Sequence, residues 1–401
     1  MIRYISMKNI LPLLFSVIFL IFLINYCVVN PYIGNHQPAA LAKSFLDGHL
    51  YITDPDHMFD TAEFNGFKYW PLGPFPALLI TPFILLIDNY FIEDYLSFFI
   101  TIITFIIIIK LSRNIGFNRK DSMYWALAFC VSTTYFFTSL VPNGWYFAHT
   151  VNSLLIFLLF YLFRHKKVNH LMIGILLGLI LMTRLPSAIF ALFFVIYIIF
   201  DSSIDSKTKI RQLSKLCIPL IVFIIILGIY NLARFDDFFN QGYSLQNMVN
   251  SKLKLARDDY GVLGIRHLPG NLYYMFLSMP IPVFINDATH VLRFPYMTFN
   301  PWGMSIFITS LWLFKIFTLK FRGRFEYLII SIVSLIALFI LLFCGTGFWQ
   351  IGYRYTLDFL PQLFFVFMIA YRREEGDLSN GMKFLISAGF ILNIFLFTTR
   401  I

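Results

Sequence analysis

The 401 residues are 59% hydrophobic and only 13% charged, and 49 of them are phenylalanine. With a mean hydropathy of +0.74, this composition excludes an ordinary soluble globular protein. The net charge of +10 does not indicate a nucleic-acid partner, because the basic residues cluster in short gaps between apolar runs. The four cysteines are scattered singly, which favours neither a metal site nor a disulfide framework. The composition therefore predicts an all-α polytopic membrane protein, with 1–401 forming a single integral membrane domain.

The first apolar run, 10–29, is long enough to cross a bilayer, whose core of about 30 Å needs ~20 apolar residues. It follows Arg3 and Lys8 and lacks a small-x-small cleavage site, so it predicts an uncleaved signal anchor with a cytoplasmic N-terminus. Residues 30–93 then form the first outer loop. Within that loop, 76–88 is short and broken by a proline, so it is interpreted as an interfacial or re-entrant helix.

The later basic gaps then all face the cytoplasm, as the positive-inside rule requires. Segment 273–292, which two prolines interrupt, is likewise expected to be re-entrant or interfacial, within a long outer loop 234–302. These two segments leave the number of spans open by two. About eleven transmembrane helices are expected in the cytoplasmic membrane, with the C-terminus outside, at roughly 10–29, 94–110, 122–139, 147–163, 168–183, 186–200, 216–233, 303–319, 326–343, 355–371 and 382–398.

The first outer loop concentrates histidine and carboxylate side chains between two membrane-grade segments. Transfer of a group to a hydroxyl needs a base that removes the acceptor proton, and a carboxylate or a histidine can serve. The Asp54-Pro55-Asp56-His57 run is also compatible with a divalent cation, although its spacing matches no specific metal motif and a solvated acidic turn fits as well. No cofactor is certain. The candidate catalytic residues are His36, Asp54, Asp56 and Asp60.

Three arginines fall at the outer ends of predicted helices, against the positive-inside trend. A charge at membrane depth costs about 2.5–3.5 kcal/mol on insertion scales, so such arginines usually face an anion. The guanidinium group pairs with phosphate or carboxylate through two parallel hydrogen bonds. Arg184, Arg234 and Arg354 are therefore predicted to bind a lipid-linked phosphate. The alternative is snorkelling to the interface, or pairing with Asp236, Asp237 or Asp358.

Other residues complete a candidate substrate-binding set. The rigid turn at 70–76 enters an apolar helix, because its prolines exclude continuous helix, and Trp70 could stack on a sugar. Equally, aromatic residues are the rule at bilayer surfaces. His149 begins a predicted span on the outer side, where it either lines the same cavity or is an interfacial histidine. The last two candidates are Lys68, which lies two residues before Trp70, and Tyr353, which directly precedes Arg354.

Short motifs lie in order along nearly the whole chain. They are Asn35-His36-Gln37, Pro71-Leu72-Gly73-Pro74, Thr183-Arg184-Leu185-Pro186, Tyr230-Asn231-Leu232-Ala233-Arg234, Asn300-Pro301-Trp302-Gly303 and Gly352-Tyr353-Arg354-Tyr355. Together they resemble the GT-C superfamily of membrane glycosyltransferases, in particular the dolichyl- or polyprenyl-phosphate-mannose protein mannosyltransferase and aminoarabinose transferase group. The resemblance implies a GT-C fold, a polyprenyl-phosphate sugar donor and transfer on the outer face to a lipid, glycan or protein acceptor.

The chain departs from that group at one place. Such enzymes carry an essential acidic residue shortly after the first span, where this sequence has Asn35-His36-Gln37. Either His36 acts as the base, or a later aspartate folds back, or the usual activity is lost. A transporter or lipid flippase is the alternative function, in which intramembrane charges line a path, but no internal repeat of the kind that such proteins often carry is evident. A non-catalytic membrane scaffold is a third possible function.

Overall fold

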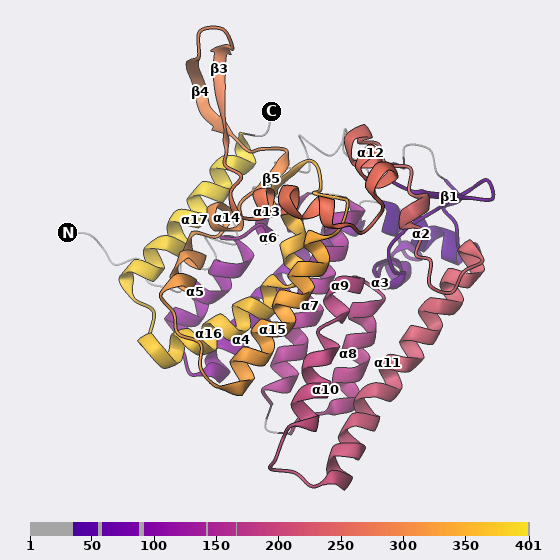
Figure 1. Ribbon diagram of the computed structural model, residues 1–401, viewed down its shortest axis with the longest axis vertical. Helices are drawn as coiled ribbons and strands as arrows, with labels where there is room; N and C mark the ends of the chain where they lie inside the picture. The colour runs from indigo at the N-terminus through magenta and orange to yellow at the C-terminus, as the bar shows by residue number, and fades with distance from the viewer. Residues whose placement is uncertain (1–34, 55–57, 88–91, 142, 166, 400–401) are drawn as a thin grey trace.

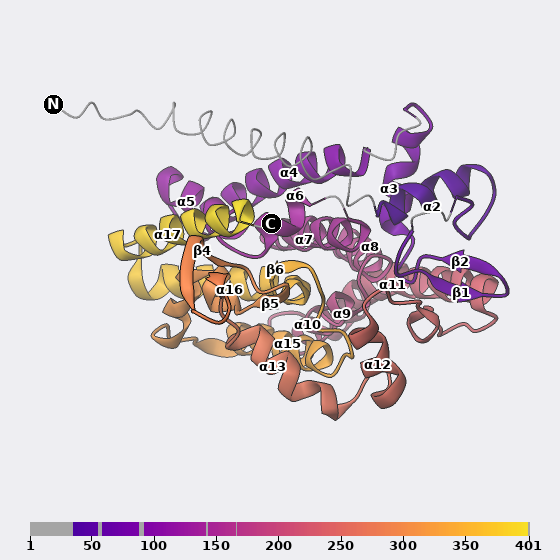
Figure 2. The same ribbon diagram turned by 90° about the horizontal axis from the view of Figure 1, so that it is seen from above.

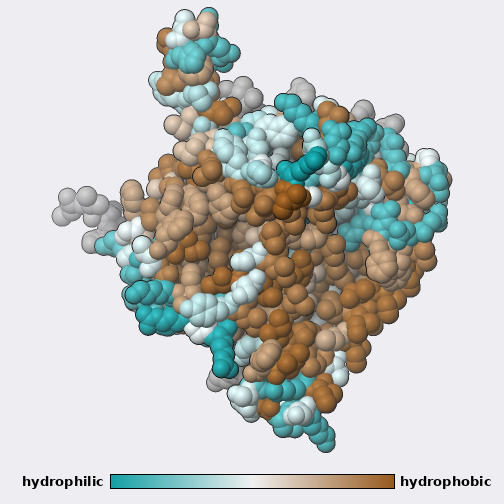
Figure 3. Space-filling view, viewed as in Figure 1, coloured by the Kyte–Doolittle hydropathy of each residue, from teal (hydrophilic) through white to brown (hydrophobic). Residues whose placement is uncertain are grey.

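The computed structural model describes residues 35–54, 58–87, 92–141, 143–165 and 167–399. This part of the chain is a mostly helical body (Figure 1). Hydrophobic residues cover the middle of the face seen in Figure 3, with hydrophilic residues gathered above and below that band. The predicted first span, 10–29, and the candidate base Asp56 lie outside the described residues.

Five helices in the described part of the chain are long and apolar enough to cross a membrane. Their presence confirms the prediction of a helical membrane protein. Helix α11 packs against α8 (His170–Leu181), and α4 packs against α7. The five are α4 (Ile92–Ile115), α7 (Gly144–Phe163), α11 (Ser206–Phe235), α15 (Gly323–Leu341) and α17 (Asn380–Thr398).

Several other predicted spans are not single helices, so the eleven-span count is not confirmed. Within 122–139 the helix breaks because Thr133 Oγ1 donates to the Phe129 carbonyl and accepts from the Tyr135 amide, in competition with the backbone. The pieces are α5 (Arg119–Cys130) with α6 (Tyr135–Leu140), α9 (Leu185–Ala188) with α10 (Ala191–Ile199), α14 (Ile306–Thr309) with the 3-10 helix η3 (Leu311–Phe317), and the 3-10 helix η4 (Arg354–Asp358) with α16 (Leu360–Glu375).

A layer of short elements covers one end of the body. Figure 2, seen from above, places β5 and β6 near its middle, with α12 and α13 on one side and α4 on the other. The all-α prediction omits three small two-stranded sheets that the described residues form, two of them in this layer and the third in a hairpin that projects from it. The elements are α2 (Gln37–Leu46), β1 (Ala62–Phe64), β2 (Phe67–Tyr69), α3 (Phe75–Ile84), η1 (Tyr243–Leu245), α12 (Ser251–Tyr260), η2 (Ile265–His267), α13 (Leu268–Phe276), β5 (Trp302–Met304) and β6 (Gln350–Gly352).

Segment 273–292 is not a re-entrant helix. Helix α13 ends at Phe276, and two strands follow, β3 (Ile281–Asn286) and β4 (Val291–Thr298), which pair antiparallel. The hairpin projects from the body (Figure 1). Pro280 and Pro282 lack the amide hydrogens that a helix would use. The apolar residues of β3 therefore adopt an extended backbone instead.

The basic gaps between helices meet at the end of the body opposite that layer. Arg164, after α7, lies 3.5 Å from the Asn114 carbonyl near the end of α4. Arg373, near the end of α16, pairs with Glu326 at the start of α15. Lys209, at the start of α11, donates to the Ile199 carbonyl at 2.8 Å. The predicted topology, which puts these gaps on one side, agrees with this arrangement.

The turn at 70–76 is held tightly against the body. The Phe75 amide donates to the Met182 carbonyl at 3.1 Å, and a Cβ on Gly73 would overlap that same carbonyl oxygen. Glycine is therefore required here by the close approach of two backbones. On the other side of the turn, Arg234 Nη1 donates to the Trp70 carbonyl at 2.6 Å.

We predict that Gly73→Ala destabilises the protein by about 1–3 kcal/mol, because the backbone segments must separate to admit the methyl group. Gly270 in α13 is the matched control, since a Cβ there meets nothing within 4 Å. Gly270→Ala should stabilise by about 0.5–1 kcal/mol. Thermal unfolding in detergent measures both. Equal effects of the two substitutions would contradict this packing.

Candidate functional site

A single large cavity dominates the described surface at the end that carries the layer of short elements. It has a volume of about 1800 Å³ and is lined by the first outer loop, the start of α7, the α9 turn, the loop at 239–253, the end of α15 and η4. Cavities of this kind, lined by apolar walls with a few convergent polar groups, are the usual places for ligands. The candidate residues that line it are His36, Asp54, Asp60, Arg184 and Arg354.

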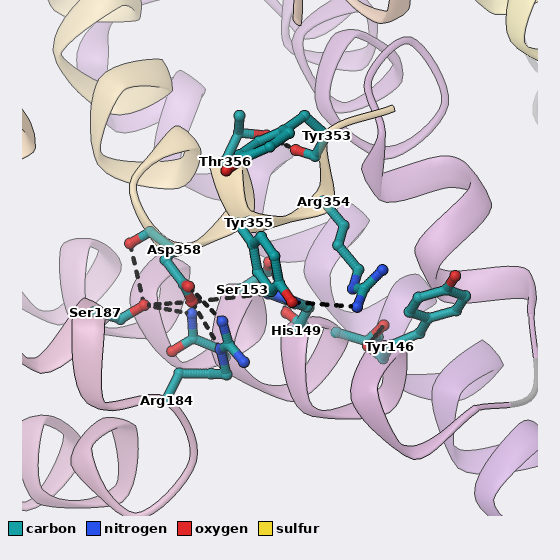
Figure 4. A network of polar contacts seen from close by, with 12 residues as sticks. Tyr146, His149, Ser153, Arg184, Ser187, Tyr353, Arg354, Tyr355, Thr356 and Asp358 are labelled. Atoms are coloured by element: carbon teal, nitrogen blue, oxygen red, sulfur yellow. Dashed lines mark hydrogen bonds and ion pairs between the residues drawn. The ribbon is translucent and has the colours of Figure 1, made fainter. Parts of the chain in front are cut away.

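A buried ion pair forms the floor of the cavity (Figure 4). Arg184 Nε donates to Asp358 Oδ1 at 3.0 Å and Nη2 donates to Oδ2 at 2.6 Å. Ser187 Oγ lies 3.1 Å from the same carboxylate and accepts from Asn152 Nδ2 at 2.8 Å. Both charges are buried, at 4% and 0% exposure. The pairing alternative therefore applies to Arg184, although its side chain also reaches the cavity wall.

His149 lies beneath this pair rather than in the cavity wall. It is fully buried in α7, with Nδ1 3.7 Å from Asp358 Oδ1 and its ring 6.0 Å from that of Tyr355. Figure 4 shows it behind Tyr355. The position lets His149 support the carboxylate from within the body. It does not bring His149 to a ligand in the cavity.

Arg354 lines the cavity and makes its contacts with uncharged groups. Its Nη1 donates to Gln350 Oε1 at 3.0 Å and to the Phe348 carbonyl at 3.3 Å. The guanidinium also lies over the rings of Tyr146 and Tyr355, 5.1 Å and 4.9 Å from their centroids. Among the described residues, the ion pairs include none with Arg354. Its positive charge therefore remains available to an anion in the cavity.

Arg234 has a different position. It does not line the cavity. Besides the bond to the Trp70 carbonyl, Nη2 donates to Asn231 Oδ1 at 2.8 Å, and the guanidinium stacks 3.9 Å from the centroid of Tyr230. These contacts tie the first outer loop to the end of α11. The three arginines thus do not converge at one point.

Asp60 faces the cavity from the first outer loop. Its Oδ1 accepts a hydrogen bond from the Val249 amide at 2.9 Å, and its backbone adopts φ +57°. Burial raises the pKa of this carboxyl, while the Val249 amide and the positive charge of Arg354 oppose the rise. Asp60 and Arg354 thus line the same cavity with opposite charges.

His36 and Asp54 also line the cavity. His36 is buried just before α2, with Nδ1 4.0 Å from Glu93 Oε2 at the start of α4. Burial lowers the pKa of His36 to about 4, so the imidazole is neutral near pH 7. Asp54 is exposed at the rim. Asp56 lies outside the described residues.

The remaining candidates lie away from the cavity. Trp70 is 1% exposed and packs at an inclined angle against Trp145, with ring centroids 4.5 Å apart, so its position does not support a role in stacking on a sugar. Lys68 pairs with Glu63 in the β1–β2 ladder. Tyr353 is buried and donates to Asn271 Oδ1 at 2.9 Å. These residues contribute to the layer of short elements rather than to the cavity wall.

Sequence reasoning missed several residues that the structure brings to the site. Glu93 reaches His36 from the start of another helix. Gln350 joins the loop at 345–349 to Arg354. Phe348 and Trp349 project into the cavity from that loop. The Gly-Thr-Gly-Phe-Trp run at 345–349 is the one signal that could have pointed there.

The described residues contain no group of three or more His, Cys, Asp or Glu placed to hold a metal ion. Asp56 and His57, part of the predicted cation site, lie outside them. No family model matches the chain, and no curated protein matches it. Any function assigned to this chain therefore rests on the geometry of the cavity.

We predict that Asp358→Ala destabilises the protein by about 3–5 kcal/mol, because it leaves the Arg184 guanidinium buried without its partner. The double variant Arg184→Met with Asp358→Ala should lose less than the sum of the single changes. Asp377, which is 61% exposed and pairs with Arg372, is the control, and Asp377→Ala should cost under about 1 kcal/mol. Additive losses, measured by thermal unfolding, would show that the two side chains do not interact.

Proposed function

We propose that this protein is a membrane glycosyltransferase of the GT-C type, which transfers a sugar from a polyprenyl phosphate to an acceptor hydroxyl on the outer face of the membrane. One observation carries the proposal. One cavity is lined both by Arg354, whose guanidinium has no carboxylate partner among the described residues, and by Asp60. A cation for the leaving phosphate and a base for the acceptor are the two groups that this transfer needs.

The proposed orientation puts the cavity outside. The basic gaps meet at the opposite end of the body, and the positive-inside rule favours the cytoplasm for that end. The described helices run back and forth between the two ends (Figure 1). This order is compatible with about eleven crossings, a cytoplasmic N-terminus and an outer C-terminus in the cytoplasmic membrane.

In this proposal the donor lies with its phosphate beside Arg354 and its chain along an apolar wall. That wall is formed by Leu185 from α9 and by Phe339, Ile340 and Phe343 from the end of α15. Hydrocarbon is stabilised there by the removal of apolar surface from water. Arg184, already paired with Asp358, adds hydrogen-bonding capacity at the floor without adding net charge.

The proposed reaction uses Asp60 as the base. The carboxylate removes the proton of the acceptor hydroxyl, the acceptor oxygen bonds to the anomeric carbon, and the bond between that carbon and the phosphate oxygen breaks. The polyprenyl phosphate leaves with the electron pair of that bond, and Arg354 stabilises its charge. His36, neutral at pH 7 beside Glu93, is the alternative proton acceptor.

We predict that Arg354→Gln lowers kcat/KM for donor turnover by about 10²-fold or more, because the leaving phosphate loses its cation. Arg354→Lys should retain part of the activity. The purified protein, in vesicles, would be given radiolabelled undecaprenyl-phosphate hexoses, and the release of undecaprenyl phosphate measured. Arg293→Gln, an exposed change on the β3–β4 hairpin, is the control. Movement of intact donor across the bilayer without release would support a flippase instead.

We predict that donor turnover rises with pH through an ionisation above the ordinary aspartate pKa of about 4, because burial raises the pKa of Asp60 and only its charged form accepts a proton. Asp60→Asn should abolish that rise. Asparagine keeps an oxygen for the Val249 amide and tolerates positive φ, so the variant tests the charge alone. Asp287→Asn, at the exposed hairpin turn, is the matched control. An unchanged pH profile in Asp60→Asn would assign the base elsewhere, with His36 next.

A further inference from the structure

Three aromatic side chains face the cavity beside Arg354. Phe348 and Trp349 are 39% and 36% exposed, and Trp302 is half-buried. All three line the cavity. By contrast, Trp70 is buried away from the cavity, and Trp145, which borders the cavity, is also buried. Large aromatic surfaces left open inside a cavity, rather than on a lipid-facing surface, indicate a site that a ligand covers.

The backbone holds Trp349 in an unfavourable conformation. Its φ is +56°, in the left-handed region that a bulky residue rarely adopts. Two contacts maintain it, since the Tyr146 hydroxyl donates to the Trp349 carbonyl and Gly347, with φ +83°, allows the preceding turn. Backbone strain of this kind concentrates at ligand-binding positions. The fold therefore keeps the indole in place at the expense of local stability.

The loop at 345–349, called here the aromatic loop, is joined directly to the proposed phosphate site at Arg354. Strands β5 and β6 pair Trp302 with Gln350. The Gln350 amide donates to the Trp302 and Thr346 carbonyls at 3.0 and 2.8 Å, and its oxygen accepts from Arg354 at 3.0 Å. A single buried side chain thus fixes the distance between the aromatic rings and the Arg354 guanidinium.

The chemistry of this wall suits a saccharide. The C–H bonds on one face of a sugar ring are weakly positive and pack against the negative face of an aromatic ring. Hydroxyl groups at the ring edge need polar partners, which the cavity supplies in Asn143, Asn250 and Lys252. Lys252 Nζ lies 5.9 Å from the Trp302 ring centroid. The wall of α9 and α15 is formed by leucine, isoleucine and phenylalanine side chains, so it suits a hydrocarbon chain instead.

We propose that Trp302, Phe348 and Trp349 form a saccharide-binding subsite for the acceptor, so that the acceptor is a glycan of more than one sugar unit. The proposal rests on the glycosyltransferase function proposed above. Trp302 and Phe348 are in contact, with ring centroids 5.0 Å apart, and Trp349 follows Phe348 directly in the chain. The three side chains form one stretch of the cavity wall beside Arg354, where the donor phosphate is placed. An acceptor bound here would have a hydroxyl group near the anomeric carbon.

Trisaccharide binding tests the subsite without any donor. The purified protein in detergent would be titrated with mannotriose, maltotriose, galactotriose and chitotriose, and binding followed by saturation-transfer NMR. Trp349→Gly removes the indole and suits the positive φ, so its unfolding midpoint should shift by less than about 3 °C. We expect at least one trisaccharide to bind the wild type and the variant to bind it at least about tenfold more weakly. Phe294→Ala, an exposed aromatic on β4, should bind as the wild type does.

The outcomes separate this subsite from the proposed transfer reaction. Binding of a trisaccharide through Trp349 without any release of undecaprenyl phosphate would retain the subsite and reject the transferase. With active protein, Trp349→Gly should raise the KM for the glycan about tenfold or more and leave the KM for the donor unchanged. Failure of all four trisaccharides to bind, or a larger effect on the KM for the donor, would overturn the proposal. Transfer to a Ser/Thr-rich peptide but to no trisaccharide would also overturn it.

Discussion

The buried ion pair between Arg184 and Asp358 is the interaction on which the site depends. It joins the turn after α8 to η4, two segments that are 174 residues apart in the sequence. An unpaired charge at this depth would be strongly unfavourable, whereas the bidentate geometry and the neighbouring Ser187 satisfy both groups. Because η4 also carries Arg354, fixing Asp358 fixes the cation that reaches the cavity.

The layer of short elements completes the cavity through further polar contacts. Arg234 holds the Trp70 turn, Gln350 holds the aromatic loop, and the Val249 amide holds Asp60. These contacts position Arg354 and Asp60, which both line the cavity. In the proposed function, the pairing of Asp358 with Arg184 limits the repulsion that an anionic lipid head would meet from that carboxylate.

The sequence predicted the parts that depend on hydropathy and charge placement. The long apolar helices, the common end of the basic gaps and the placement of Arg184 and Arg354 at the opposite end follow from local composition. Contacts between distant segments could not be predicted, so the approach of Glu93 to His36 and the Gln350 network were missed. The β3–β4 hairpin was mistaken for a broken helix because Pro280 and Pro282 are compatible with both. The positive φ of Trp349 has no signature in a single sequence.

Locating a bound polyprenyl phosphate tests the central claim most directly. The full-length protein with added undecaprenyl phosphate would be imaged by cryo-electron microscopy. We expect phosphate density beside the Arg354 guanidinium and chain density along α9 and the end of α15. Lipid phosphate bound at the basic end of the body, with the cavity empty, would contradict the account.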